Sequence, residues 1–320
     1  MRPILLSLLL LLMSPLVSGE YSRSYLDSHE LKTAEVNGIN IAYRIVGDGK
    51  GEAQVKDRPK VVVIMGLGGS NVAWGDTLIS GIVDAGYEVL MFDNRDTGES
   101  TRFDDWGQPT LWLQLLKHSL GMQVNAPYSL NDMAADAVAL MDLVGYEDAH
   151  IIGASMGGMI AQIVAAKHPE RTRSLISIMS TTGATHLPAP TNMAENRLRD
   201  LAEGEAQAER EAAIRARGFF PQSMPRHLMA VFKVGDRSVD VATIQADTLV
   251  LHGVDDGLIP PAHGEHTAEL IERSEFILLE GMGHSMPDAV MPKIISSLTG
   301  HMNKVEASML AAAASKGTAH

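Results

Sequence analysis

The chain has 320 residues, of which 45% are hydrophobic and 20% are charged, a composition typical of a globular protein that can bury one large core. Its formal net charge of −13 argues against nucleic acid as a partner, because an acidic surface repels phosphate backbones. The chain has no cysteine, which excludes disulfides, cysteine-ligated zinc, a thiol nucleophile and a lipidated N-terminal cysteine.

Residues 1–19 have the three-part pattern of a secretory signal peptide. Arg2 supplies one positive charge, residues 4–13 are apolar, and Val17-Ser18-Gly19 ends the segment with a small residue. The apolar stretch is shorter than the roughly 20 residues that a membrane-spanning helix needs. We therefore expect cleavage near Gly19 and a secreted or periplasmic protein without a stable membrane span. The alternative is an uncleaved N-terminal anchor.

The next segments predict the first strands of a sheet. Residues 20–31 are polar and unpatterned, and we interpret them as a linker. Residues 33–46 alternate between apolar and polar side chains around Asn37-Gly38, which predicts a β-hairpin. Residues 60–65 (K-V-V-V-I-M) form a β-branched run without polar alternation, typical of a strand that is buried on both faces of a parallel sheet.

From this strand onward, helices and strands alternate as in an α/β protein. The alternation predicts a mostly parallel, eight-stranded sheet with helices on both faces. The expected helices are at 76–85, 129–144, 159–168, 262–271 and 292–303, and the further strands are at 87–92, 150–152, 174–179, 247–252 and 275–279.

One segment interrupts the alternation. Residues 183–240 contain proline-punctuated and charged helical sequence but no buried strand, so we predict an inserted, mostly helical lid. The alternative is a solvated excursion without a role in binding. The α/β core then comprises residues 20–182 and 241–303, and residues 304–320 are expected to form a flexible tail.

The pentapeptide Gly153-Ala154-Ser155-Met156-Gly157 stands between a predicted strand and a predicted helix, with the G-x-S-x-G spacing of a nucleophile elbow. Such a serine sits on a strained turn, and the flanking glycines leave room for neighbouring backbone. The turn lifts the Ser155 hydroxyl to the edge of the sheet and places the Met156 amide to help hold an oxyanion. Because so short a pattern also recurs by chance, its interpretation as a nucleophile depends on the other residues that accompany it.

A serine nucleophile needs a base, and the base needs an acid that fixes its tautomer. Among twelve histidines, His284 lies in a glycine-flanked loop beyond a predicted strand, at the edge expected for the serine. The loop after the 247–252 strand carries Asp255 and Asp256, whereas the loop after the 174–179 strand has no carboxylate. The chain order is thus serine, acid, histidine.

Four motifs, I-M-G-L-G-G, G-A-S-M-G-G, L-H-G-V-D-D-G-L-I-P and G-M-G-H, together resemble the α/β-hydrolase fold family across residues 36–303. F-D-N-R-D-T-G-E-S and P-A-H-G-E-H are similar to segments of its aclacinomycin methylesterase-like branch. The resemblance implies Ser155 as nucleophile, His284 as base and Asp256 as acid. It also implies the amides of Leu67 and Met156 as the oxyanion hole. We expect no cofactor and no metal.

Two departures from the family bear on the substrate. Met65 stands where many relatives have a histidine, which leaves backbone donation intact, and the predicted lid is shorter than in the polyketide methylesterases, so their substrate does not carry over. The leading hypothesis is a serine esterase that cleaves carboxylic esters of small neutral molecules through an acyl-enzyme on Ser155. An amidase or aminopeptidase, a C–C bond hydrolase and a non-catalytic binding protein of the same fold are the alternatives.

Overall fold

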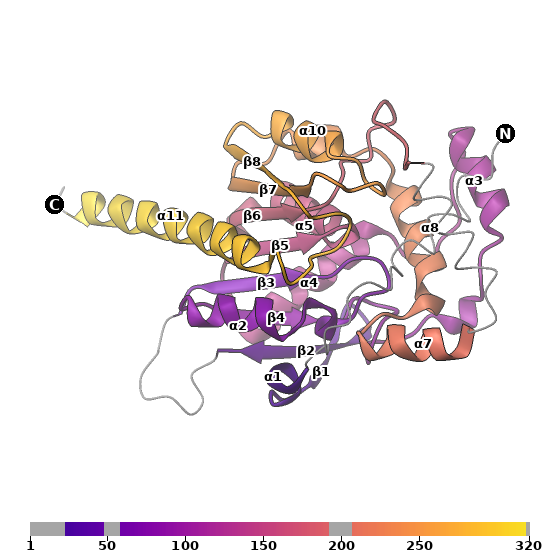
Figure 1. The fold of residues 1–320 in the computed structure, drawn as a ribbon, viewed down its shortest axis with the longest axis horizontal. Coiled ribbons are helices and arrows are strands. Elements are labelled where there is room, and N and C mark those ends of the chain that lie inside the picture. The colour runs from indigo at the N-terminus through magenta and orange to yellow at the C-terminus, as the bar shows by residue number, and fades with distance from the viewer. Residues whose placement is uncertain (1–22, 48–57, 192–206, 318–320) are drawn as a thin grey trace.

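The centre of the computed structural model, which describes residues 23–47, 58–191 and 207–317, is an eight-stranded sheet (Figure 1). The strand order is β1-β2-β4-β3-β5-β6-β7-β8; β2 is antiparallel to both its neighbours, and all other pairs are parallel. This arrangement confirms the predicted sheet. The strands are β1 (Lys32–Val36), β2 (Ile39–Val46), β3 (Lys60–Ile64), β4 (Glu88–Phe92), β5 (Ala149–Ala154), β6 (Thr172–Ile178), β7 (Asp247–Gly253) and β8 (Ser274–Leu279).

The first two strands form the predicted hairpin. Its turn consists of Asn37 and Gly38, whose φ angles of 51° and 74° are both positive. Positive φ at both central residues suits the right-handed twist of the flanking strands, and it sets the pairing of Val36 with Ile39. The turn is further fixed by a hydrogen bond from the Asn37 side chain to Asp136.

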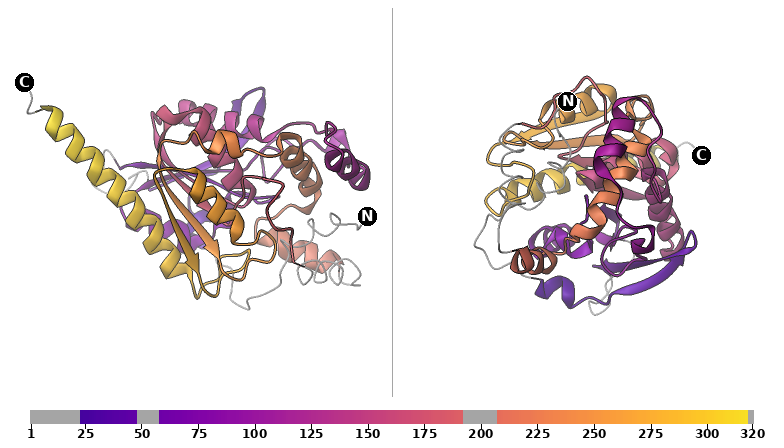
Figure 2. Two further views of the ribbon diagram at one scale, coloured as in Figure 1. Left: turned by 90° about the horizontal axis from the view of Figure 1, so that it is seen from above. Right: turned by 90° about the vertical axis from the view of Figure 1, so that its right-hand side faces the viewer.

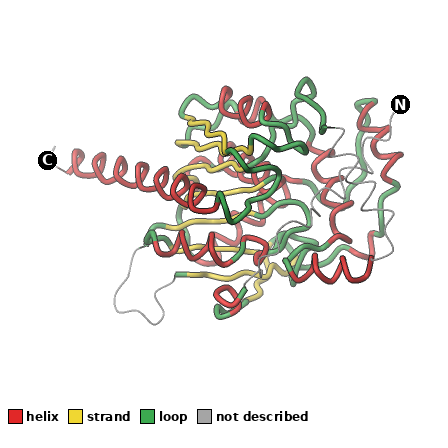
Figure 3. The backbone as a smooth tube through the Cα atoms, viewed as in Figure 1, coloured by secondary structure: helices red, strands yellow, loops and turns green. Residues whose placement is uncertain are grey.

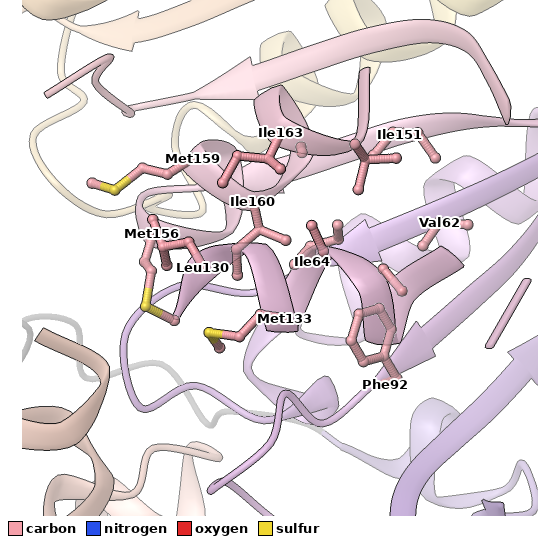
Figure 4. Packing of buried hydrophobic residues seen from close by; sticks show 14 of the residues in the cluster. Val62, Ile64, Phe92, Leu130, Met133, Ile151, Met156, Met159, Ile160 and Ile163 are labelled. Atoms are coloured by element: carbon pink, nitrogen blue, oxygen red, sulfur yellow. The ribbon is translucent and has the colours of Figure 1, made fainter. Parts of the chain in front are cut away.

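Helices cover both faces of the sheet (Figure 2). The strand β3 shows why: Val61 and Val63 pack into the core of one face, and Val62 and Ile64 pack into the core of the other. Figure 4 shows the second of these cores. The first face is covered by α2 (Asp76–Asp84) and α11 (Met291–Gly317), and the second by α4 (Leu130–Val144), α5 (Met156–Lys167), α9 (Ser238–Val241) and α10 (Ala262–Leu270).

Two terminal segments differ from the sequence-based expectation. The predicted linker contains the short helix α1 (Ser24–Asp27), where Leu26 is fully buried and its amide donates to Asp76 at the start of α2. The tail predicted to be flexible is helical as far as Gly317, because residues 307–317 are mostly alanine and other strong helix formers. The predicted signal peptide, residues 1–19, lies outside the described residues.

Two long connections meet beyond one end of the sheet, opposite the free end of α11 (Figure 1). One joins β4 to α4 and includes η3 (Asp104–Trp106) and α3 (Leu111–Ser119). The other joins β6 to β7 and contains the described part of the predicted 183–240 insertion, with α7 (Gln207–Ala216), η5 (Pro221–Ser223) and α8 (Met224–Val234). Helices α3 and α8 pack against each other. Figure 3 shows that loops form most of the backbone between these helices and the sheet.

Two short 3-10 helices, η2 (Asn71–Trp74) and η4 (Pro169–Arg171), complete the secondary structure of the described residues. Within the described ranges, no helix is both long and apolar enough to cross a bilayer.

Candidate active site

The nucleophile elbow joins β5 to α5, and Ser155 occupies its tip. Ser155 has φ 55° and ψ −121°, a region that L-residues rarely adopt and that costs on the order of 1–3 kcal/mol. Two hydrogen bonds hold this conformation: the Ser155 amide donates to the Ile178 carbonyl at 2.9 Å, and the Ser180 hydroxyl donates to the Ser155 carbonyl at 2.8 Å. The neighbouring strand β6 therefore supports the strained residue.

The glycines of the elbow are required by close backbone contacts. A Cβ atom on Gly157 would lie 1.9 Å from the Ile64 carbonyl oxygen, and one on Gly153 would lie 2.2 Å from the Gly157 oxygen. Only glycine at positions 153 and 157 lets β3, β5 and the start of α5 pack this tightly. A Cβ on Gly66, in the turn after β3, would lie 3.0 Å from the Cβ of Ser155.

The structure brings together the three side chains that the sequence analysis selected. His284 Nε2 lies 2.9 Å from Ser155 Oγ, and His284 Nδ1 lies 2.8 Å from Asp256 Oδ2. The three residues follow the carboxyl ends of β5, β8 and β7, so the parallel strands deliver them to one edge. A continuous relay of hydrogen bonds thus runs from a buried carboxylate to a serine hydroxyl.

The structure distinguishes Asp256 from its neighbour. Asp256 is buried and its Oδ1 accepts the amides of Leu258 and Ile259, both at 2.9 Å, whereas Asp255 is exposed. Burial by itself raises the pKa of Asp256, but the adjacent His284 imidazole and the hydrogen bonds outweigh it and hold that pKa well below its usual range. Asp256 is therefore an ionised acceptor.

His252, at the end of β7, is a neighbour of the acid that sequence reasoning did not place in the site. Its Nε2 lies 2.7 Å from the Ile259 carbonyl oxygen and 3.4 Å from Asp256 Oδ2. Because a carbonyl can only accept, Nε2 carries the hydrogen and presents it to the carboxylate as well. The spacing of four residues between His252 and Asp256 was the one available signal.

The candidate oxyanion hole is formed by backbone. Residues 66–69 form a turn in which the Gly69 amide donates to the Gly66 oxygen at 3.0 Å, and this turn passes beside Ser155. The Leu67 amide has no acceptor among the described residues. The Met156 amide stands at the first position of α5, where helix amides lack an intrahelical partner. Both predicted donors are thus available.

The nucleophile is largely covered. Ser155 is 8% exposed, and the side chain of His284 is 5% exposed. The 183–240 insertion contacts the turn at residues 66–69, where Phe219 forms an antiparallel bridge with Gly69 and the Phe220 amide donates to the Gly68 oxygen at 2.7 Å. No group of three or more histidine, aspartate or glutamate side chains within the described residues is arranged to hold a metal ion.

Residues 59–218, half of the chain, match the family model of the alpha/beta hydrolase fold. The chain belongs to the α/β-hydrolase family. As a member of this family it is an enzyme that catalyses hydrolysis, which the sequence analysis predicted, and the sheet order and the elbow described above agree with that membership. A second serine–histidine–carboxylate grouping, described below, lies outside this site.

Relatives of this α/β-hydrolase include rhodomycin D methylesterase DauP of Streptomyces sp. (strain C5), which is 24% identical over 286 residues and covers 75% of this chain and 90% of its own. This similarity confirms the predicted resemblance to the aclacinomycin methylesterase-like branch. RutD of Pseudomonas savastanoi pv. phaseolicola, named for carbamate hydrolysis, is 25% identical over 252 residues, 72% of this chain and 89% of its own.

Among solved structures, the enol-lactonase from Burkholderia xenovorans LB400 resembles this α/β-hydrolase with a TM-score of 0.62 and 19% identity. The likeness extends over 85% of this chain and 100% of the lactonase chain, and it shows the shared fold.

The second grouping lies at the amino-terminal edge of the sheet. His150 Nδ1 is 2.7 Å from Ser174 Oγ, and His150 Nε2 is 3.0 Å from Glu306 Oε1. Ser174 and His150 are fully buried within β6 and β5, so no substrate reaches them. The grouping ties α11 to the sheet. Hydrogen bonding between these residue types is thus insufficient for catalysis, which also needs access and an oxyanion hole.

Proposed function

We propose that this protein is an exported serine esterase that cleaves carboxylic esters of small neutral molecules. The observation that carries the proposal is the relay from Asp256 through His284 to Ser155 at the edge where the oxyanion-hole amides stand. The relation to a methylesterase supports ester chemistry. Export is supported by the signal-peptide pattern of residues 1–19.

The mechanism follows from the donors and acceptors of the site. Because Asp256 is ionised and accepts from Nδ1, His284 presents an unprotonated Nε2 to Ser155. Nε2 takes the hydroxyl proton as Oγ attacks the ester carbonyl carbon, and the amides of Leu67 and Met156 bind the resulting oxyanion. Each such donor is worth about 2.7–4 kcal/mol in the transition state.

Collapse of the tetrahedral intermediate breaks the bond to the alkoxy group. The proton held on His284 Nε2 passes to the leaving oxygen, and an alcohol departs from an acyl-enzyme on Ser155. Water then repeats the sequence: Nε2 removes its proton, hydroxide attacks the acyl carbon, and the proton returns to Ser155 Oγ as the carboxylic acid leaves. Besides the substrate, the proposed cycle needs only groups of this chain and one water molecule.

The surroundings of the serine support a small substrate. The 183–240 insertion acts in this proposal as the predicted lid, and its Phe219 and Phe220 lie against the turn at residues 66–69. With Ser155 only 8% exposed, a bulky acyl group enters only if the lid moves. Partly apolar cover and an acidic surface favour neutral esters with acyl chains of modest length.

The proposal is tested by labelling and turnover. A fluorophosphonate probe should label the wild-type protein at Ser155, and the Ser155→Ala variant should lose both labelling and hydrolysis of p-nitrophenyl esters while remaining folded. Ser174→Ala is the matched control, because it removes the serine of the buried second grouping and should preserve both activities. Turnover retained by Ser155→Ala, or no labelling of folded wild type, would reject the assignment.

Carbamate or amide hydrolysis is the second candidate, and the relation to RutD favours it. The same relay serves both bonds, since an amine leaving group also takes its proton from His284. Comparing kcat/KM for matched ester, carbamate and amide substrates of one acyl or carbamoyl group distinguishes them. A higher kcat/KM for the carbamate or amide would overturn the ester assignment while leaving the relay intact.

A further inference from the structure

His227, on the helix α8 of the insertion, is a fully buried histidine that the relay does not use. The Gly68 amide donates to its Nδ1 at 3.1 Å, and its Nε2 lies 2.9 Å from the Arg95 carbonyl oxygen. An amide only donates and a carbonyl only accepts, so Nδ1 is the acceptor and Nε2 carries the hydrogen. His227 is therefore a neutral imidazole with one tautomer.

The first of these contacts reaches the oxyanion hole. Gly68 directly follows Leu67, whose amide is a proposed oxyanion donor, and the two peptide planes that flank Leu67 share its Cα atom. Once the direction of the Gly68 amide is fixed, only the φ and ψ rotations of Leu67 remain to set the direction of the Leu67 amide. Gly68 has φ +66°, which glycine adopts readily because its backbone is less restricted than that of other residues. Contacts from outside the turn therefore add to the Gly69–Gly66 hydrogen bond in holding Gly68 in place.

The insertion holds both polar atoms of Gly68. Its amide donates to His227, and its carbonyl accepts the Phe220 amide at 2.7 Å. A further pair of bonds runs from the Ser70 amide and hydroxyl to the Gly218 oxygen, each at 2.8 Å. The turn at residues 66–69 is thus joined along its outer side to the segment that we propose as the lid.

The helix that carries His227 is itself fixed by charge. The neighbouring Arg226 has no exposed surface and binds both carboxylate oxygens of Asp96, which is also fully buried. The same guanidinium reaches Asp104, and Asp96 accepts the Tyr128 hydroxyl at 2.8 Å. Such a bidentate pair defines orientation as well as position. His227 therefore stands on a rigid support that spans two loops of the sheet.

We propose that His227 is a positioning residue for the oxyanion hole. Its Nδ1 atom holds the Gly68 amide and so directs the Leu67 amide at the oxygen of the tetrahedral intermediate. The insertion, in addition to its proposed role as a lid, thereby completes the catalytic site, and a displaced α8 leaves the oxyanion hole with one directed donor. The inference rests on the proposed function, since it assigns a role in that same reaction.

Two amide substitutions separate the contacts of His227. In the His227→Asn variant, the side-chain oxygen takes the place of Nδ1 and still accepts from Gly68. In the His227→Gln variant, the amide nitrogen takes the place of Nε2 and still donates to Arg95, but no acceptor faces Gly68. Both variants lose one hydrogen bond, so a purely structural role predicts similar losses of stability and no difference in kcat.

We expect the His227→Asn variant to keep kcat for p-nitrophenyl acetate within about threefold of wild type. The His227→Gln variant should lose on the order of 10²-fold in kcat with little change in KM, as when one oxyanion donor is removed. Its affinity for a trifluoromethyl ketone, which forms a tetrahedral oxyanion on the serine, should fall by the same factor. Equal kcat values for two folded variants would overturn the inference.

A measurement on the wild-type protein covers the case in which the His227→Gln variant does not fold. The Gly68 amide should exchange its hydrogen at least about 10³-fold more slowly than an unprotected amide, because His227 holds it. Exchange near the unprotected rate would overturn the inference. If Ser155→Ala stays active, the proposed function fails; if Ser155→Ala is inactive but His227→Gln keeps its kcat, this inference alone fails.

Discussion

Replacing Asp256 with asparagine tests the relay most directly, because the structure determines how the new side chain must lie. Oδ1 of Asp256 accepts two backbone amides, from Leu258 and Ile259, and Oδ2 faces His284. Asparagine keeps both amide bonds only if its oxygen stays on that side. Turning it round loses two hydrogen bonds, about 1–3 kcal/mol in total, so the amide nitrogen faces His284.

This orientation of the asparagine reverses the tautomer of the His284 imidazole. Nδ1 of His284 must then accept a hydrogen bond, so the hydrogen moves to Nε2, which can no longer take the proton of Ser155. The imidazolium that forms in the transition state also loses its carboxylate partner. We expect kcat for p-nitrophenyl acetate to fall by on the order of 10⁴, equivalent to about 5 kcal/mol in the barrier.

The assay compares this variant with Asp255→Asn, which makes the same charge change one residue away on an exposed side chain. The Asp255→Asn variant should keep its kcat, and the rate of fluorophosphonate labelling should follow kcat in both. Thermal unfolding verifies that each variant is folded. A folded Asp256→Asn variant with more than a tenth of the wild-type kcat would refute the reasoning, as would an equal loss in Asp255→Asn.

Two further predictions concern stability. Gly157→Ala should lower the free energy of unfolding by more than about 3 kcal/mol, because its Cβ would lie 1.9 Å from the Ile64 oxygen. Gly300→Ala in α11, where a Cβ meets nothing within 4 Å, should raise it by about 0.5–1 kcal/mol. Equal melting temperatures of the two variants would contradict this. Burial lowers the pKa of His227 to about 4, so the unfolded chain, with a histidine pKa near 6.5, binds more protons between these values. The stability that the neutral His227 contributes to the folded protein is fully present above about pH 6.5 and is lost as the pH falls toward 4. At pH 5 this loss is about 2 kcal/mol. The free energy of unfolding, measured in urea, should fall between pH 7.5 and pH 5 by about 2 kcal/mol less in the His227→Asn variant than in the wild type. An equal fall in both proteins would contradict this prediction.

The sheet and the three side chains of the relay were predictable because their signals are local. The elbow is contiguous in sequence, and His284 and Asp256 each follow a strand whose apolar run is plain. Strand ends in a parallel sheet share one edge, so position along the chain translates into position in space. The choice of Asp256 over Asp255 came from the family resemblance, whereas burial and the two backbone amides explain it physically.

What the sequence did not reveal depends on contacts between distant residues. His227 lies 159 positions from Gly68, and no short motif announces a pairing across that separation. The bounds of α8 were not predicted, because the sequence analysis expected a mostly helical insertion without placing this helix within it. Pro225 occupies the first turn of α8, where proline is tolerated. The length of α11 was underestimated because its small residues were interpreted as fraying rather than as helix formers.

The long helix α11 also provides a point of attachment that lies far from α3, α7 and α8. Its far end points away from α3, α7 and α8 (Figures 1 and 2), while its base is anchored through Glu306 to Arg173 and His150. A linker joined to that end would attach the protein to a bead or electrode with α3, α7 and α8 turned toward the surrounding solution. Immobilisation through the C-terminal helix should therefore preserve turnover of dissolved esters.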